Sequence, residues 1–335
     1  MIKAWGVKAA GNPFERLDYE PTELGPEEVE VAVEYCGVCH SDLSMVDNEW
    51  GMTAYPLIPG HEVVGRIVAL GSQTKGLVIG QQVGIGWNAA SCMHCSPCLG
   101  GNQHLCATAH PTIVAHHGGF AERVRAHWPW VIPLPKGVRP EVAGPLYCGG
   151  ITVFSPLFEL DIKPTSRVGI VGIGGLGHMA IKFANAWGCE VTAFTSSPAK
   201  AAEARSLGAH NVVSSKDSKE IAAIAGQLDL VIVTVNATLD WDAIIASLAP
   251  KGRLHIVGAV LEPIPVHAFA LIMGQKAVSG SPTGSPTVMA KMLEFCERHG
   301  IEPTVEEFPM SQVNQAMDRL RAGKAHYRIV LKNDF

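Results

Sequence analysis

The sequence predicts an α/β protein of two domains, one built on a doubly wound parallel sheet and the other mostly β. Its 335 residues are enough for roughly two domains of ordinary size. Residues 150–284 alternate apolar strands with amphipathic helices, which is typical of a parallel sheet covered by helices. Residues 1 to about 148 contain short strands between glycine and proline turns, which indicates an irregular β region.

The mostly β domain is expected to comprise residues 1–149 and 285–335. Its strands are predicted at "VEVAVEYCGV", "EVVGRIVAL" and "QQVGIGW". Ser285 and Pro286 form a good helix start, as N-cap and first helical residue, and Gly300 forms a good stop. The final "YRIVLK" is expected to return to this domain.

The second domain is expected to comprise residues 150–284. Its strands are predicted at "RVGIVG", "EVTAF", "LDLVIVTV" and "GRLHIVGA". The intervening helices are predicted near residues 175–187, 198–207 and 240–248. This order of elements is the basis of the fold prediction.

Composition narrows the classes of partner and compartment. Hydrophobic residues make up 47%, charged residues 17%, and the net charge is −5 with no basic block, so neither nucleic acid nor an anionic membrane is expected as a partner. The N-terminus reaches charged residues too early for a signal peptide, and the apolar stretch from Val168 to Phe183 is broken by glycines, His178 and Lys182. The sequence therefore predicts a soluble cytoplasmic protein, in which nine cysteines are expected to be metal ligands or buried thiols.

A loop with four cysteines, "CMHCSPCLGGNQHLC", is the strongest local motif. Two, two and seven residues separate its cysteines, so one folded-back loop can present four thiolates as a tetrahedron, the geometry of a structural zinc site. The alternative is that these cysteines are small buried hydrophobes. The loop is polar and rich in glycine, which favours the metal.

A G-x-G-x-x-G motif closes the first strand of the second domain and opens the next helix. It consists of Gly172, Gly174, Gly175, Leu176 and Gly177 with one intervening isoleucine. In that context the backbone N–H groups of the helix start bind the pyrophosphate of a dinucleotide, and the helix dipole favours the anion. The motif therefore predicts a Rossmann domain, with a turn that binds no ligand as the alternative.

The next strand indicates which dinucleotide binds. An NAD-binding domain usually carries an acid about 20 residues further on, to hold the ribose 2′-hydroxyl. This strand ends instead in Thr195, Ser196 and Ser197, followed by Lys200. Hydroxyls and a cation suit a 2′-phosphate, so the predicted cofactor is NADP(H), although Lys200 taken alone also fits an exposed helix lysine.

Three further segments, "YCGVCHSDLS", "PGHEVVG" and "LYCGGITVF", contribute Cys39, His61 and Cys148. One histidine and two cysteines with an open fourth position form a known type of catalytic zinc site. Each residue alone is weak support for a site.

Together with the four-cysteine loop and "GIGGLG", these motifs resemble the zinc-dependent medium-chain alcohol dehydrogenases over essentially the whole chain. "HSDLSMVDNEWG", "AGPLYCGGITVFSPL" and "VTAFTSSPAK" are similar to the cinnamyl alcohol dehydrogenase-like branch, and most of all to bacterial NADPH-dependent aldehyde reductases of broad specificity. The resemblance implies a mostly β GroES-like catalytic domain beside the Rossmann domain, and often a homodimer joined through the cofactor-domain sheets, for which "KAVSGS" is a possible edge strand.

The resemblance also implies two zinc ions and the residues that hold them. A catalytic ion would be bound by Cys39, His61 and Cys148, with water or Glu62 as the fourth ligand, and Asp42 would orient His61. The ligands of a structural ion would be Cys92, Cys95, Cys98 and Cys106. Cys36, Cys189 and Cys296 are expected to be ordinary thiols.

Further roles follow from the same resemblance. The cofactor would contact Thr152, Gly172, Gly174, Gly175, Leu176, Gly177, Ser196, Ser197, Lys200, Val257, Ser279 and Arg328. Ser41 would pass a proton to the product oxygen. Ser44 with water or the cofactor ribose would carry the proton onward, and His40, expected near the cofactor pyrophosphate, is the weaker catalytic candidate for that step. Many relatives carry the proton onward through a histidine at the position of Ser44, so this sequence departs from them. Trp50 and Trp87 would line an apolar substrate pocket, although large aromatic side chains pack cores equally well.

The predicted activity is therefore reversible, zinc-dependent reduction of aldehydes to primary alcohols by NADPH, with broad specificity for apolar aliphatic or aromatic aldehydes. An apolar pocket distinguishes chain lengths by only about 1 kcal/mol per methylene. The alternatives are a polyol dehydrogenase, which usually favours NAD, and a non-catalytic NADPH-binding or redox-sensing protein, which would be expected to lack one of the three zinc ligands.

Overall fold

The computed structural model describes all residues, 1–335, and divides the chain into two compact units. Unit 1 comprises Met1–Ile151 and Thr283–Phe335, and unit 2 comprises Thr152–Pro282. The chain passes from the first to the second within helix α4 (Gly149–Glu159), a predominantly apolar helix. None of the helices combines the length and the apolar character that crossing a membrane requires.

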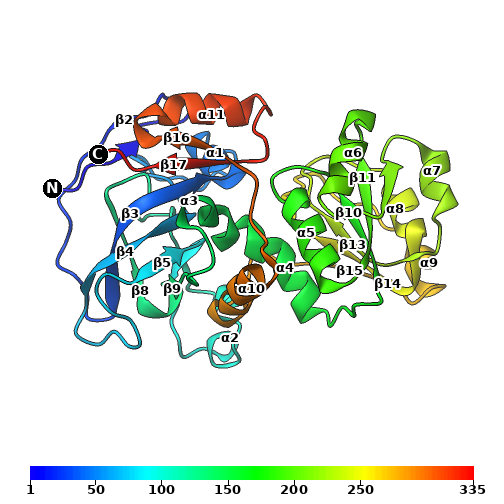
Figure 1. The fold of residues 1–335 in the computed structure, drawn as a ribbon, viewed down its shortest axis with the longest axis horizontal. Coiled ribbons are helices and arrows are strands. Elements are labelled where there is room, and N and C mark those ends of the chain that lie inside the picture. Colours follow the sequence, from blue (N-terminus) through cyan, green and yellow to red (C-terminus); the bar gives the residue numbers. More distant parts are fainter. The chain divides into compact units, whose positions relative to one another are not determined.

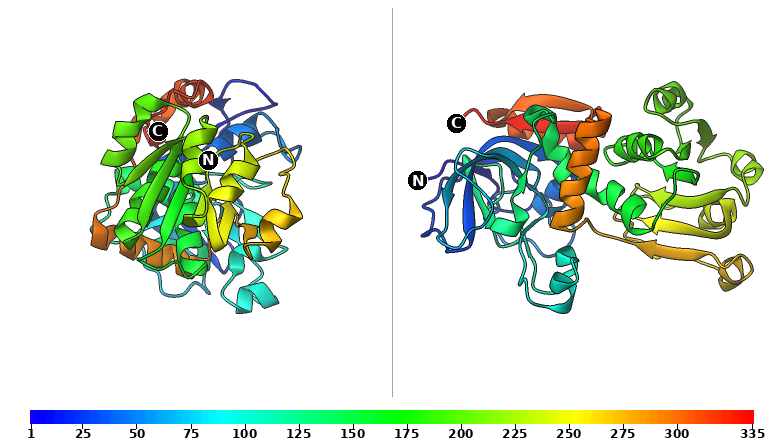
Figure 2. Two further views of the ribbon diagram at one scale, coloured as in Figure 1. Left: turned by 90° about the vertical axis from the view of Figure 1, so that its right-hand side faces the viewer. Right: turned by 60° about the horizontal axis from the view of Figure 1, so that its bottom comes forward.

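Unit 1 is built on a seven-stranded sheet. Its strands are β3 (Glu28–Val38), β4 (Val63–Leu70), β5 (Gln82–Ile85), β8 (Arg123–His127), β9 (Ile132–Pro133), β16 (Val305–Pro309) and β17 (Arg328–Lys332). The order is β16-β17-β3-β4-β5-β9, with β8 also paired to β3. The sheet brings segments far apart in the sequence together, since the C-terminal β17 lies antiparallel against β3 (Figures 1 and 2).

Smaller elements complete unit 1. They are β1 (Trp5–Gly6), β2 (Glu15–Arg16), β6 (Asn88–Ala90), β7 (His110–Pro111), α1 (His40–Val46), α2 (Ser96–Leu99), α3 (Pro140–Ala143), α10 (Pro286–His299) and α11 (Val313–Arg321). The predicted bounds of α10 hold: the Ser285 hydroxyl accepts from the N–H of Val288, and Gly300 ends the helix with φ of 62°. The core is formed by apolar side chains of β3, β4, β5, β8 and β17, packed with those of α1 and α11.

Unit 2 is a six-stranded parallel sheet with helices on both faces. Its strands are β10 (Arg167–Val171), β11 (Glu190–Thr195), β12 (Asn211–Ser214), β13 (Leu228–Val233), β14 (Leu248–Ile256) and β15 (Ala277–Gly280). Its helices are α5 (Gly177–Trp187), α6 (Ala201–Ser206), α7 (Ser218–Ala223), α8 (Trp241–Ser247) and α9 (Ala268–Ile272). In Figure 1, α5 lies on one side of the strands, and α8 and α9 lie on the other.

The strand order is β12-β11-β10-β13-β14-β15, with every neighbouring pair parallel. Counted from β10, this is the order 3-2-1-4-5-6 of the Rossmann fold, whose direction reverses between β10 and β13. The sequence-based fold class is therefore confirmed. Three predicted helices differ in their bounds. The helix expected from residue 175 begins at Gly177, and the helix expected at 198–207 is a 3₁₀ turn, Pro198–Lys200, followed by α6. The helix expected to reach Leu248 ends at Ser247, because the backbone of Leu248 is extended.

Candidate active site and metal centres

Three segments of unit 1 bring two thiols and an imidazole together. Cys39 follows β3 and is the N-cap of α1, His61 lies just before β4, and Cys148 lies just before α4. Because β3 and β4 pair antiparallel, the end of one strand lies beside the start of the other. The ligand atoms of Cys39, His61, Cys148 and Glu62 all lie within 4.8 Å of one another, and all four residues are buried.

Asp42 ties two of these segments to each other. Its fully buried carboxylate accepts hydrogen bonds from the N–H of Cys39 and the N–H of Gly60, each at 2.9 Å, and from Nδ1 of His61 at 2.9 Å. The last bond keeps the proton on Nδ1 and leaves Nε2 as an acceptor for a metal ion. Asp42 also completes the cap of α1, so the start of the helix and the orientation of His61 depend on one side chain.

The donor set fits zinc. Nε2 of His61 lies 3.3 Å from Sγ of Cys148. A tetrahedral zinc ion about 2.0 Å from nitrogen and 2.3 Å from sulfur separates those atoms by about 3.5 Å. Oε2 of Glu62 is buried without a hydrogen-bond partner and is within reach of the same point. An unsatisfied buried carboxylate oxygen is costly, and a metal ion would satisfy it.

The electrostatics of the cluster favour a cation. A hydrogen bond from Cys148 lowers the pKa of Cys39 well below its usual range, against the effect of burial. Burial opposes protonation of His61, but Asp42 and Cys39 outweigh it and raise the pKa of His61 well above its usual value. The thiolate is the form of cysteine that binds metals. The hydrogen bond to Cys39, together with burial, raises the pKa of Cys148, so the two cysteines hold one proton between them, which a bound metal ion would displace.

Arg328 supplies the counter-charge from the other end of the chain. Its guanidinium donates to Oε1 of Glu62, both side chains are buried, and the two residues are 266 positions apart. Burial raises the pKa of Glu62 to about 7, although Arg328 opposes that rise. Arg328 is expected from the resemblance to contact the cofactor, and nothing in the sequence indicates its pairing with Glu62.

The four-cysteine loop folds as a second cluster. The Sγ atoms of Cys92, Cys95, Cys98 and Cys106 all lie within 4.8 Å of one another, and Cys92 Sγ is 3.9 Å from Cys98 Sγ. Zn–S bonds of about 2.3 Å in a tetrahedron place sulfurs about 3.8 Å apart. Main-chain N–H groups point at these sulfurs, and such bonds lower the pKa of Cys106 to about 6. The loop therefore fits a structural zinc ion, and none of the nine cysteines forms a disulfide.

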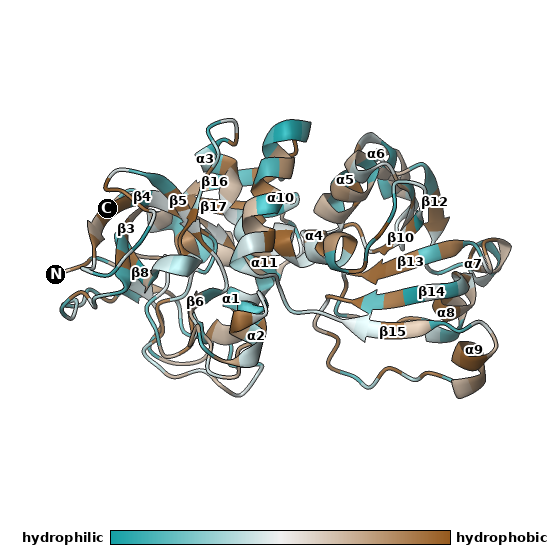
Figure 3. Cartoon of the chain, turned by 90° about the horizontal axis from the view of Figure 1, so that it is seen from below, coloured by the Kyte–Doolittle hydropathy of each residue, from teal (hydrophilic) through white to brown (hydrophobic).

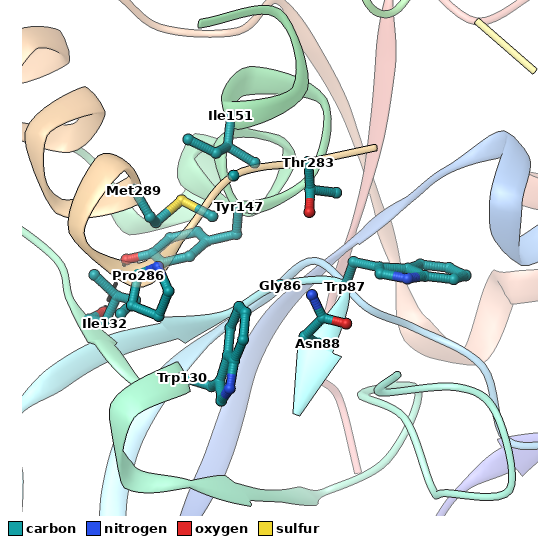
Figure 4. A pocket seen from close by; sticks show the side chains of 11 residues that line it. Gly86, Trp87, Asn88, Trp130, Ile132, Tyr147, Ile151, Thr283, Pro286 and Met289 are labelled. Atoms are coloured by element: carbon teal, nitrogen blue, oxygen red, sulfur yellow. Dashed lines mark hydrogen bonds between the residues drawn. The ribbon is translucent and has the colours of Figure 1, made fainter. Parts of the chain in front are cut away.

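Two tryptophans lie beside the catalytic cluster. The ring of Trp87 meets His61 edge-on with centroids 5.1 Å apart, and Trp50 meets Trp87 in the same way at 6.1 Å. Trp87 also lines a small pocket of about 10 Å³, room for at most one water molecule (Figure 4). The pocket's other lining residues are Gly86, Asn88, Trp130, Ile132, Tyr147, Ile151, Thr283, Gly284, Pro286 and Met289.

The glycine motif of unit 2 has the geometry of a phosphate-binding turn. Gly172 has φ of 93°, in the left-handed region that favours glycine. A Cβ atom on Gly177 would lie 1.9 Å from the carbonyl oxygen of Gly172, so only glycine lets α5 start this close to β10. Gly174, by contrast, has open space where a Cβ would be. That space suits the close approach of a pyrophosphate to the backbone.

Lys200 connects the end of β11 to this turn. Its ammonium group donates to the carbonyl of Ile173 at 3.0 Å, inside the glycine motif. Ser197 is half-buried and Ser196 is exposed, and Thr195 Oγ1 accepts from the N–H of Ser197 at 3.2 Å. Lys200 therefore lies beside the turn, whereas binding of a 2′-phosphate by Ser196, Ser197 and Lys200 stays a prediction.

Other predicted residues are found in both units. In unit 1, Ser41 Oγ lies 3.8 Å from Cys39 Sγ, whereas His40 is exposed. In unit 2, Thr152 donates to a carbonyl at 3.2 Å, Ser279 Oγ lies 2.9 Å from a histidine ring, and the N–H of Val257 donates to β13. The catalytic and cofactor-binding roles of these residues stay predictions.

One polar contact beside the site is absent from the sequence predictions. The Ser44 hydroxyl donates to Oε2 of Glu49 at 2.6 Å. The sequence signal for this contact is weak, since Glu49 follows the end of a short helix and lies five positions after Ser44. Only the turn after α1 brings the two side chains together.

Comparison with known proteins agrees with this geometry. Residues 25–136 match the alcohol dehydrogenase GroES-like domain, and residues 175–298 match the zinc-binding dehydrogenase family. An aldehyde reductase of Synechocystis sp. is 53% identical over 99% of both chains. A cinnamyl alcohol dehydrogenase of Sorghum bicolor has a TM-score of 0.95 at 35% identity, covering 99% of this chain and 97% of that one. A cinnamyl alcohol dehydrogenase of Helicobacter pylori, solved with NADP(H), has a TM-score of 0.90 at 30% identity, with the same coverage. The chain therefore belongs to the family of zinc-dependent medium-chain alcohol dehydrogenases.

Proposed function

We propose that this enzyme reduces aldehydes to primary alcohols, reversibly, with NADPH as the hydride donor. The observation that carries the proposal is the buried cluster of Cys39, His61 and Cys148, with Glu62 beside it. When bound there, zinc supplies a Lewis acid that polarises the carbonyl oxygen and offsets the negative charge that develops on it. When bound to unit 2, NADPH supplies the hydride from C4 of its nicotinamide.

The residues around the cluster have distinct tasks in this proposal. Asp42 keeps His61 in the tautomer that leaves Nε2 able to bind the metal. Ser41 donates a proton to the oxygen of the product, and its position 3.8 Å from Cys39 Sγ supports that task. Trp50 and Trp87 exclude water and contact the substrate, which favours apolar aliphatic or aromatic aldehydes.

Preference for NADPH rests on the end of β11. Ser196, Ser197 and Lys200 offer hydroxyls and a cation to a 2′-phosphate, and no carboxylate stands there to repel it. The relative from Helicobacter pylori that was solved with NADP(H) supports the same choice. In this proposal, unit 2 is the domain that binds NADPH and unit 1 is the domain that binds zinc.

We further propose a cytoplasmic homodimer that pairs through the edge strand β15. Unit 2 exposes Phe269, Ile272 and Met273 by 75, 64 and 81%. Phe269 and Ile272 belong to α9 and Met273 follows its last residue, a spacing of three and four positions that places them on one helix face. Part of α9 is brown in Figure 3. An exposed apolar face of this kind marks an interaction site. Light scattering of the purified enzyme tests the proposal: a dimer is expected for the wild type and a monomer for Phe269→Glu.

Initial rates test the activity. The zinc-loaded enzyme is assayed by nicotinamide absorbance with NADPH and with NADH, over aliphatic, aromatic and sugar aldehydes, before zinc removal, after it, and after zinc is restored. Rapid turnover of apolar aldehydes with NADPH, lost and regained with zinc, is expected. Preferred turnover of sugars with NADH would instead support a polyol dehydrogenase. If no carbonyl compound is turned over, although zinc is fully bound and NADPH binds, the protein would instead be a non-catalytic NADPH-binding protein.

A further inference from the structure

The small pocket of unit 1 contains two buried polar side chains that have no partner in the chain. Asn88 is the first residue of β6 and has 5% of its surface exposed, and Thr283, which lies shortly before α10, has 9%. Neither the amide of Asn88 nor the hydroxyl of Thr283 forms a hydrogen bond with another residue. Because a buried polar group without a hydrogen bond is costly, both groups call for a partner from outside the chain.

The two polar groups face the same space. Figure 4 shows the hydroxyl of Thr283 turned toward Asn88, whose amide lies beside the ring of Trp87. Most of the other lining side chains are aliphatic or aromatic. An apolar pocket with a few convergent polar groups is typical of a site that recognises one polar group of a ligand.

Other polar groups of the pocket wall are already committed. Nε1 of Trp130 donates to the hydroxyl of Ser91 at 3.1 Å. The hydroxyl of Tyr147 donates to the carbonyl of Ile132 at 3.2 Å. These two groups would have to break an existing hydrogen bond to serve a ligand, whereas the unpartnered amide and hydroxyl would not.

The backbone on either side of Asn88 is held in place. The N–H of Thr112 donates to the carbonyl of Trp87 at 2.8 Å, and its hydroxyl donates to the carbonyl of Gly86 at 2.7 Å. Asn88 itself is paired with Pro111 of β7. The amide is therefore presented to the pocket from an ordered strand, which suits recognition of a group at a defined position.

Two lining residues connect the pocket to the metal cluster. The ring of Trp87 is 5.1 Å from that of His61, and Tyr147 directly precedes Cys148. A substrate whose reacting oxygen lies at the cluster can therefore extend its other end past Trp87 into the pocket. The volume of about 10 Å³ is room for at most one water molecule, so a single hydroxyl group is the size of group that the pocket accepts.

We propose that Asn88 and Thr283 bind a hydroxyl group at the far end of the substrate. The enzyme then favours aldehydes that carry a distal hydroxyl, together with the diols that correspond to them. This inference rests on the proposed function and narrows its substrate class. A hydroxyl donates one hydrogen and accepts on its oxygen, so it can donate to the amide oxygen of Asn88 and accept from Thr283. A methyl group in the same place leaves both side chains unpaired.

A purely structural role for the two side chains makes a different prediction. If they only hold a fixed water molecule, Asn88→Leu should lower the thermal midpoint of unfolding and change kcat/KM by the same factor for every substrate. If they bind a distal hydroxyl, the loss in kcat/KM should be confined to substrates that carry one. Thr283→Val removes the second polar group and provides an independent variant of similar shape.

The experiment measures alcohol oxidation by the zinc-loaded enzyme with NADP⁺. A series of α,ω-diols of increasing length is compared with the primary alcohols in which a methyl group replaces the second hydroxyl. At the length that reaches the pocket, the wild type should prefer the diol by about tenfold in kcat/KM, counted per hydroxyl group. In Asn88→Leu and in Thr283→Val this preference should disappear, while the primary alcohols are still oxidised.

Met289→Leu is the matched control, because it alters an apolar wall of the same pocket at nearly constant volume. It should change kcat/KM for diols and primary alcohols alike, and loss of the preference in this variant would overturn the inference. A wild type that oxidises primary alcohols but prefers no diol would overturn the inference alone, as would a preference that survives in both Asn88→Leu and Thr283→Val. A wild type that oxidises no alcohol would overturn the proposed function, and the inference with it.

Discussion

His255, a buried histidine of unit 2, should make the stability of the protein depend on pH. It lies on β14 with 3% of its surface exposed. Its Nδ1 and Nε2 each lie 2.9 Å from a hydroxyl, of Ser279 and Ser281 respectively. A neutral ring can donate to one hydroxyl and accept from the other. Burial, with the charge of Arg253 adding to it, lowers the pKa of His255 from 6.5 to about 4.

The size of the effect follows from the two pKa values. The unfolded chain binds the proton at about pH 6.5, and the folded chain binds it only near pH 4. The stability that neutral His255 contributes is therefore complete above pH 6.5 and is lost as the pH falls to 4. At about 1.36 kcal/mol for each pKa unit, the loss is about 3 kcal/mol. Since both serines are only half-buried, a discount for solvent screening reduces the expected loss to about 2 kcal/mol.

The assay is the free energy of unfolding in urea for wild type and His255→Gln, measured from pH 7 to pH 4.5. The wild type should lose about 2 kcal/mol more than the variant over this range, because glutamine has no proton to gain. His267→Gln, at an exposed histidine paired with Asp242 in the same unit, should follow the wild type. A constant difference between wild type and His255→Gln at every pH would refute the reasoning.

Three further predictions concern the metal sites and the cofactor. Asp42→Asn should weaken zinc binding at the catalytic site by about 10- to 100-fold, since His61 loses its charged partner; unchanged affinity in a chelator competition would contradict this. Cys98→Ser should leave one zinc ion per chain and lower the thermal midpoint, measured by metal analysis and calorimetry, whereas two retained ions would rule out the four-cysteine site. Lys200→Ala should raise KM for NADPH about tenfold and leave KM for NADH unchanged. An equal rise in both KM values would contradict the proposed contact between Lys200 and the 2′-phosphate.

Features encoded by neighbouring residues could be predicted from the sequence. The ligands of the four-cysteine cluster lie within one loop, and both ends of α10 depend on Ser285 and Gly300 beside it. The alternation of strands and helices similarly indicates a doubly wound sheet, because each βαβ unit is formed by one contiguous segment of chain and has a right-handed crossover. For these features, spacing along the chain is enough to define geometry.

The catalytic cluster is different, since its three predicted ligands are far apart in sequence. Cys39, His61 and Cys148 are individually weak signals in the sequence, and only the resemblance to a family groups them. Their proximity depends on the pairing of β3 with β4 and on the position of the segment before α4. No local pattern encodes those distances.

The sequence by itself thus determined the fold class, the structural-zinc loop and the phosphate-binding turn, because each depends on contacts within a short stretch of chain. Only the tertiary structure decided that Arg328 pairs with Glu62, that Ser44 meets Glu49, and that His255 is buried between two hydroxyls. These contacts depend on how β17 lies against β3, how the chain turns after α1, and how β14 pairs with β15. Burial and charge at those contacts, which set the protonation of each group, exist only once the chain has folded.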